Sequence, residues 1–152
     1  MKRCGLFRSL VIPVLAATVL VAGAVFVGDR AQAAGVIKFG AALPLTGPLA
    51  TEGNKQKAGY EIWKNLVNNQ GGINVGGKKM KVEIRYYDYE SKTPVASKLY
   101  ERLITKDKVD FLFGPFGSGA TASVAALTER YEIPIMAPTA SSAKLYARAY
   151  KY

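Results

Sequence analysis

Hydrophobic and polar positions after residue 35 follow two periodicities that alternate along the chain. Short apolar runs at 36–43, 82–87, 109–113 and 133–136 are typical of buried strands. Between them, apolar residues recur every three or four positions over 51–69, 94–104 and 118–131, which indicates helices. A further helix is expected to begin near Ala143. The order β-α-β-α-β-α-β predicts an α/β fold, a parallel sheet with helices on both faces.

Glycine pairs mark two boundaries in this pattern. The pair at 71–72 ends the helix predicted over 51–69, and the pair at 76–77 forms a turn that opens the second strand. Tyrosines 86, 87 and 89 near the end of that strand indicate packing, because alternate residues face the helices on either side. The apolar residues at helical spacing in the first helix are Ala58, Ile62, Trp63, Leu66 and Val67.

The first 33 residues have the three parts of a secretory signal peptide. A basic start precedes an apolar run over 10–27, and Ala31-Gln32-Ala33 offers the small residues that a signal peptidase reads. We therefore expect cleavage after Ala33 and a mature segment over 34–152. An uncleaved anchor is the alternative, since an apolar run of about 18 residues is near the lower limit for a bilayer span. In both cases the remainder of the chain leaves the cytoplasm.

Composition removes several classes of chemistry. The chain has no histidine, and its one cysteine, Cys4, falls in the segment expected to be removed. An intrachain disulfide, a Cys/His metal site and a nucleophile paired with histidine are therefore excluded, and we expect no cofactor, no metal and no catalysis. The neighbouring acids Asp88 and Glu90 leave an envelope enzyme open as a rival hypothesis, although a surface turn is the simpler interpretation.

The chain carries a net charge of +10, to which residues 1–33 contribute +3 and the remainder +7. A basic surface of that size can bind nucleic acid or an anionic membrane. The lysines are scattered, apart from those at 78, 79 and 81, so a solvated surface is the simpler interpretation. We expect no nucleic-acid partner.

Ligands of open parallel sheets bind at the carboxyl ends of the strands, in the loops that precede the helices. The loops over 44–51, 114–121 and 137–142 qualify. The second is rich in glycine and places Ser118 at or near a helix N-cap, where free backbone N–H groups and the helix dipole attract an anion. A plain capping serine explains the same residue without any ligand.

The third loop adds Thr139, Ser141 and Ser142, whose hydroxyl groups accept from an ammonium or donate to a carboxylate. Because two such loops on consecutive strands converge at one edge, a small-molecule site there is favoured. A loose dinucleotide pattern, Gly117-x-Gly119-x-x-Ala122, follows the third strand rather than the first and lacks the strand-end acid. Nucleotide binding is therefore not favoured.

Six stretches, taken in order, carry a family resemblance: 40–48, 71–73, 86–88, 113–118, 133–135 and 138–141. No single stretch is specific, but the ordered set covers nearly the whole mature segment. On this basis, residues 36–152 resemble the N-terminal lobe of the leucine/isoleucine/valine-binding protein family, the type I periplasmic binding proteins. The chain would then be an incomplete lobe, and the resemblance implies a second lobe that closes over the ligand.

The resemblance also implies roles for individual residues. The family's carboxylate-binding serine falls on Ser118, and the loop after the fourth strand supplies a backbone group and a hydroxyl at Thr139 and Ser141. Where the first loop often carries an aromatic that covers the ligand, this chain has Glu52, which puts branched-chain specificity in doubt. Amino acids, amides and aromatic acids therefore stay open as ligands.

The implied function is the substrate-binding component of an ABC importer, a monomer when complete. It would capture an amino acid or similar small carboxylate in the periplasm and deliver it to the permease subunits in the membrane. The alternative is the ligand-sensing extracytoplasmic domain of a membrane receptor, which shares this lobe.

Overall fold

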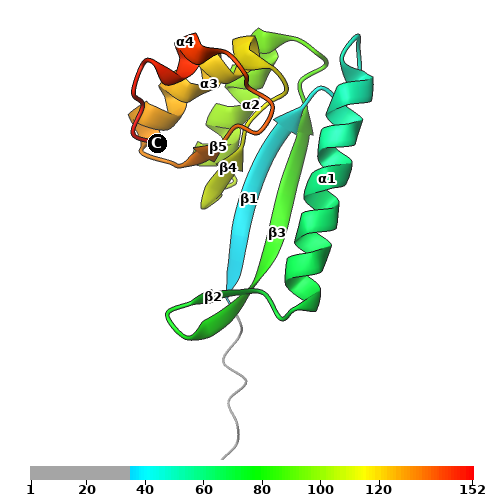
Figure 1. The fold of residues 1–152 in the computed structure, drawn as a ribbon, viewed down its shortest axis with the longest axis vertical. Helices are drawn as coiled ribbons and strands as arrows, with labels where there is room; N and C mark the ends of the chain where they lie inside the picture. Colours follow the sequence, from blue (N-terminus) through cyan, green and yellow to red (C-terminus); the bar gives the residue numbers. More distant parts are fainter. Residues whose placement is uncertain (1–34) are drawn as a thin grey trace, which may run out of the picture. The chain divides into compact units, whose positions relative to one another are not determined.

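A computed structural model describes residues 35–152, and Figure 1 shows their fold. The predicted signal peptide at 1–33 lies outside the described residues. Within the described part, no helix combines the length and the apolar character that crossing a membrane requires. The elements are β1 (Val36–Leu43), α1 (Ala50–Asn69), β2 (Ile73–Val75), β3 (Lys78–Asp88), α2 (Thr93–Thr105), β4 (Phe111–Phe113), α3 (Ser118–Tyr131), β5 (Ile135–Met136) and α4 (Ala143–Tyr146).

The five strands form one sheet in the order β2-β3-β1-β4-β5. β1 pairs in parallel with β3, from Val36 opposite Lys81 to Leu43 opposite Asp88, and in parallel with β4 on its other side. β4 and β5 are also parallel, whereas β2 runs antiparallel to β3. The predicted parallel α/β sheet is confirmed, with β2 as an addition.

The sequence pattern missed β2 because this short strand is largely exposed and has the polar Asn74 between its two apolar residues, so it carries no buried apolar run. Gly76 and Gly77 have φ of +57° and +84°, so they form the two-residue turn of a hairpin between β2 and β3. As a result β3 begins at Lys78, four residues before the predicted start. Two other strands are shorter than predicted. β4 begins after Asp110, whose carboxylate accepts from the Lys38 N–H at 2.8 Å, and β5 begins after Pro134, which has no N–H to donate.

Side chains alternate along β1 and build a core on each face of the sheet. Phe39 and Leu43 pack with Tyr60 of α1, whereas Ala42 packs with Tyr100 of α2 and Val124 of α3. The expectation of helices on both faces is therefore confirmed. Figure 1 shows α1 running along β1 and β3, apart from the group of α2, α3 and α4.

α1 does not turn its most apolar stripe toward the sheet. Ile62 and Leu66 are 70% and 56% exposed, so these two of the predicted apolar positions face away from the core. Trp63 and Val67 pack against the sheet instead. The close approach of α1 to the chain at Pro44 determines which side of the helix meets the sheet. Only glycine fits there, because a Cβ at Gly53 would lie 2.2 Å from the carbonyl oxygen of Pro44. The buried residues of α1 are Gly53, Gln56 and Tyr60.

Candidate functional site

The chain order creates a switch point between β1 and β4. From β1 the chain passes through α1 to β3, which lies on one side of β1. β4 lies on the other side of β1, and from it the chain passes to α3 on the opposite face of the sheet. Loops that leave neighbouring strands toward opposite faces open a crevice at their carboxyl ends, which is where ligands bind in open α/β sheets. The loops over 44–49, 114–117 and 137–142 border this edge.

Ser118 lies at the start of α3, but it does not cap the helix. The N-cap residue is Gly117, with φ +86° and ψ 152°, and no side chain caps this end. The first helical hydrogen bond runs from the Thr121 N–H to the Gly117 carbonyl at 3.1 Å. The N–H groups at 118–120 precede that bond, so they have no acceptor inside the helix. The plain capping interpretation of Ser118 is therefore wrong.

The Ser118 hydroxyl instead joins two loops. Its Oγ accepts from the N–H groups of Ser141 and Ser142, both at 3.1 Å. A hydroxyl oxygen accepts about two hydrogen bonds, so these contacts use its acceptor capacity and leave its proton to be donated. Ser118 is thereby held as a hydrogen-bond donor at the start of α3.

Thr139 and Ser141 lie at the same edge. The Thr139 hydroxyl donates to the Pro115 carbonyl at 3.2 Å, which leaves the threonine oxygen free to accept. The Ser141 N–H is engaged by Ser118, so its exposed hydroxyl is the group it can still offer. The structure therefore brings the three predicted residues together, although none of these contacts by itself identifies a ligand.

Asp88, at the end of β3, organises the first loop and was not predicted to do so. Its carboxylate accepts from the Leu45 N–H (2.9 Å), the Thr46 N–H (3.3 Å), the Thr46 hydroxyl (2.7 Å) and the Glu90 N–H (2.8 Å). Desolvation by burial acts to raise the pKa of Asp88, but these hydrogen bonds outweigh it and lower the pKa below its ordinary value. The bond to the N–H two residues ahead is an Asx turn, which an aspartate at a strand end could have indicated.

The acid pair of the rival enzyme hypothesis is not arranged for proton transfer. Four donors occupy Asp88, and the Glu90 carboxylate lies 2.8 Å from the Lys92 ammonium. Ser91 continues the loop support, since its Oγ accepts from the Leu49 N–H at 3.1 Å and donates to the Thr46 carbonyl at 2.7 Å. This segment holds the loop over 44–49 in place.

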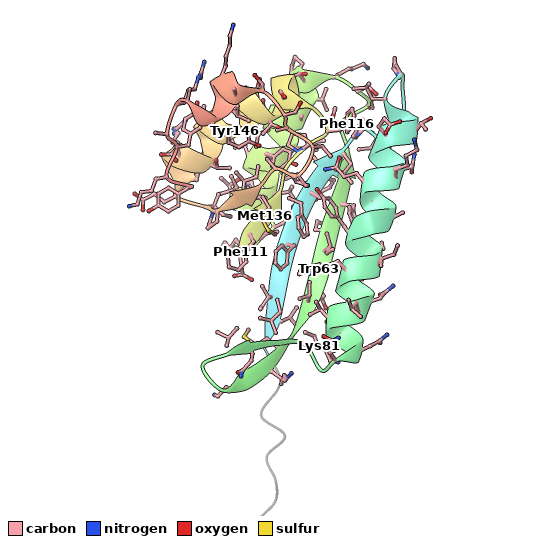
Figure 2. All side chains as sticks on the ribbon, in the orientation of Figure 1. Trp63, Lys81, Phe111, Phe116, Met136 and Tyr146 are labelled. Carbon is pink, nitrogen blue, oxygen red and sulfur yellow. The ribbon has the colours of Figure 1, made fainter. Side chains whose placement is uncertain are left out.

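Two buried tyrosines support the carboxyl ends of the central strands. The single proton of the Tyr100 hydroxyl is shared between the carbonyls of Phe113 (2.5 Å) and Ala42 (3.3 Å), and the Tyr89 hydroxyl donates to the Phe116 carbonyl at 3.3 Å. Burial raises the pKa of Tyr89 to about 12 and that of Tyr100 well above its ordinary value, so both stay protonated donors. Figure 2 shows Phe116 at this end of the sheet.

The described residues bring no three histidine, cysteine, aspartate or glutamate side chains together in a cluster that could hold a metal ion. What the edge offers is a set of hydrogen-bond donors and acceptors: free helix N–H groups, the Ser118 proton and the Thr139 oxygen. Such a set can bind a small molecule that carries a carboxylate.

Comparison with known proteins identifies the family to which this fold belongs. The family profile described as periplasmic binding protein matches residues 36–150. A Leu/Ile/Val-binding protein homolog 3 of Brucella melitensis is 30% identical over 128 residues, which is 84% of this chain and 33% of the relative. The chain belongs to the leucine/isoleucine/valine-binding family of periplasmic binding proteins. The fold and the resemblance inferred from the sequence are thus confirmed.

Two further members of the family show how far the likeness extends. The leucine-, isoleucine-, valine-, threonine- and alanine-binding protein of Pseudomonas aeruginosa is 28% identical over 79% of this chain and 31% of its own length. The crystal structure of the branched-chain amino acid transporter substrate-binding protein LivJ from Streptococcus pneumoniae, in complex with isoleucine, matches with a TM-score of 0.68 and 30% identity, covering 74% of this chain and 31% of LivJ. The chain therefore spans about a third of these relatives, and membership of this family indicates a location outside the cytoplasm.

Proposed function

We propose that this chain provides the first lobe of an ABC-importer substrate-binding protein. In this role it captures an amino acid or similar small carboxylate in the periplasm and presents it to the permease subunits. The observation that carries the proposal is the Ser118 hydroxyl, whose oxygen is occupied by two N–H donors and whose proton is left to donate.

A ligand carboxylate at this edge accepts from the Ser118 hydroxyl and from the free N–H groups at 118–120. The dipole of α3 favours the same negative charge. The Thr139 oxygen accepts from a ligand ammonium, and the exposed Ser141 hydroxyl adds a further polar contact. The complex of LivJ with isoleucine makes α-amino acids the first ligands to test, and a second lobe supplies the remaining contacts.

Glu52 bears on which amino acid is bound. It lies in the first turn of α1, and its carboxylate is 3.0 Å from the Lys55 ammonium. A charged, salt-bridged side chain gives little apolar cover for a branched side chain. The proposal therefore names the α-carboxylate and α-ammonium as the recognised groups and leaves side-chain preference to measurement.

The test is Ser118→Ala in a two-lobed protein that begins with this chain, with isoleucine and a panel of other amino acids titrated by calorimetry. Loss of a hydrogen bond to a charged carboxylate costs about 1.5–3 kcal/mol, so affinity is expected to fall roughly ten- to a hundredfold. Ser118→Thr keeps the hydroxyl and should retain most of the affinity. Ser123→Ala, an exposed position on the same helix, is the matched control.

Ser118→Ala also leaves two backbone N–H groups without their acceptor, so a modest loss of stability is expected in the absence of ligand. The two effects separate because only the first depends on ligand. Unchanged affinity together with a lowered melting temperature would mean that Ser118 is structural and that the carboxylate binds elsewhere.

A ligand-sensing domain of a membrane receptor is the second candidate. The apolar run over 10–27 favours it if that run stays attached as an anchor. The two functions therefore differ in the mature N-terminus.

A further inference from the structure

The strand β3 has a neighbour on both sides over only part of its length. Among the described residues, β2 pairs with it over 78–80, and from Lys81 to Asp88 it pairs with β1 alone. We call the side of β3 that faces away from β1, over residues 82–86, the β3 edge. Unpaired N–H and carbonyl groups on such a side are a template for pairing with another strand.

A side chain of α1 takes the place of a strand at the first position of the β3 edge. The Asn68 amide nitrogen donates to the Val82 carbonyl, and its amide oxygen accepts from the Val82 N–H, both at 2.8 Å. A residue of an antiparallel neighbour would make the same two hydrogen bonds. Figure 1 shows this end of α1 next to the hairpin of β2 and β3. β2 therefore covers the strand as far as Met80, and Asn68 extends that cover to Val82.

The next two positions of the β3 edge have no such cover. Backbone groups in a strand point alternately to its two sides, so those of Ile84 and Tyr86 face the same way as those of Val82. Within the described part of the chain, no residue hydrogen-bonds these outward groups. A hollow of about 720 Å³ borders the strand here, and its lining includes residues 82–86 together with Lys64 and Asn68 of α1. There is therefore space beside the strand for a further one.

A second copy of β3 complements this edge in one register. If two copies pair antiparallel about Ile84, Glu83 of each lies opposite Arg85 of the other, and Val82 lies opposite Tyr86. Opposite charges directly across two strands stabilise the pair, and both charged side chains are exposed. This register requires the backbone groups of Val82, which Asn68 occupies.

The adjacent register avoids Val82 but is disfavoured by charge. Centred on Arg85, it would use only the outward groups of Ile84 and Tyr86 and would place the two arginines directly opposite each other. Like charges in that arrangement destabilise a strand pair. Asn68 therefore blocks the register that the side chains favour, and Arg85 opposes the register that Asn68 leaves available.

We propose that the Asn68 side chain prevents the β3 edge from pairing with a second copy of the chain. Without its amide, two copies join β3 to β3, antiparallel about Ile84, and form one continuous sheet. The net charge of +7 on residues 34–152 opposes self-association, but at about 0.15 M salt charges are screened beyond roughly 8 Å, whereas facing side chains are in contact. The proposal does not depend on which ligand is bound.

Sedimentation of the purified chain in the analytical ultracentrifuge measures this pairing. Asn68→Ala should lower the dissociation constant of the dimer at least about tenfold relative to the unchanged chain, because it frees one hydrogen-bonded pair in each copy. Asn69→Ala, at the adjacent exposed position, is the matched control and should stay monomeric. In the Asn68→Ala background, Glu83→Arg should weaken the dimer about tenfold by placing like charges opposite each other, and adding Arg85→Glu should restore it.

Hydrogen exchange of the unchanged chain tests the role of Asn68 without any variant. The Val82 amide should exchange at least about tenfold more slowly than the amides of Ile84 and Tyr86. An Ile84 amide as protected as that of Val82 overturns the proposal. So does an Asn68→Ala chain that stays monomeric while circular dichroism shows it folded, or a dimer that Glu83→Arg does not weaken.

Discussion

At Gly117 the backbone has φ +86° and ψ 152°, a conformation that residues with a Cβ avoid. A Cβ there would meet nothing within 4 Å, so the cost of Gly117→Ala is backbone strain alone. We expect it to lower the free energy of unfolding by about 1–3 kcal/mol. Gly119→Ala, two residues later inside α3 and equally open, should raise it by about 0.5–1 kcal/mol. Urea unfolding of both variants checks this, and equal effects would contradict it.

Asp88 should make stability depend on pH in a defined direction. Its pKa is lowered in the folded chain, so its contribution is present above the unfolded pKa of about 3.9 and is lost as pH falls through the folded pKa. Asp88→Asn should therefore cost about 1–3 kcal/mol near neutral pH and progressively less below about pH 4. Urea unfolding at a series of pH values measures this, with Glu83→Gln, exposed on the same strand, as control. A difference that does not change with pH would refute the role.

Some residues at the carboxyl ends of the strands could be predicted from the sequence, and others could not. Ser118, Thr139 and Ser141 could be proposed from the sequence because glycine, proline and hydroxyl residues at strand ends are local signals. The supports at Asp88 and Tyr100 could not, since their hydrogen bonds join residues up to 58 positions apart. Only the folded sheet brings those partners together.

The C-terminus of α1 depends on lysines from another element. The helix has no basic residue in its last turn. The Lys81 ammonium of β3 donates to the Asn68 carbonyl at 2.5 Å and the Lys79 ammonium to the Gln70 carbonyl at 3.3 Å, where the helix dipole favours positive charge. Part of the one lysine cluster in the sequence therefore has a structural role. Figure 2 places Lys81 beside this end of α1.

Lys81→Met should consequently lower the free energy of unfolding by about 0.3–1 kcal/mol at low ionic strength. Salt screens such interactions, so the difference from wild type should shrink at about 1 M NaCl. Thermal unfolding at two salt concentrations measures both effects, and Lys78→Met, exposed on the same hairpin, is the control. If Lys78→Met costs as much as Lys81→Met, the capping contact is not responsible.

The sequence predicted which segments are helices more fully than it predicted which side of each helix packs against the sheet. Periodicity indicated α1, α2 and α3 because each repeats apolar residues over several turns. It did not identify which side of α1 meets the sheet, since Gly53 and Gln56 are selected there by close approach and hydrogen bonding rather than by hydrophobicity. Gln56, for example, donates to the Gly114 carbonyl at 3.0 Å.

At the scale of the whole molecule, the fate of the leader separates an importer component from a receptor. We expect the exported chain to begin at Ala34, because the small residues at 31 and 33 follow a basic, apolar leader. N-terminal sequencing of protein from the cell envelope measures this, and Ala33→Asp should leave uncut precursor in the membrane fraction. Exported protein that begins at Met1 would favour the anchored receptor.

Trp63 gives the molecule an intrinsic optical reporter, because it is the single tryptophan in the sequence. Its indole meets the rings of Phe39 and Phe113 edge-on, at centroid distances of 5.2 and 5.6 Å. The indole also lines an open apolar hollow on the surface, together with Met136 and Pro138. Indole fluorescence shifts to shorter wavelengths as water leaves its surroundings. The emission wavelength of the unlabelled protein therefore reports the hydration of the surface around Trp63, without a contribution from a second tryptophan.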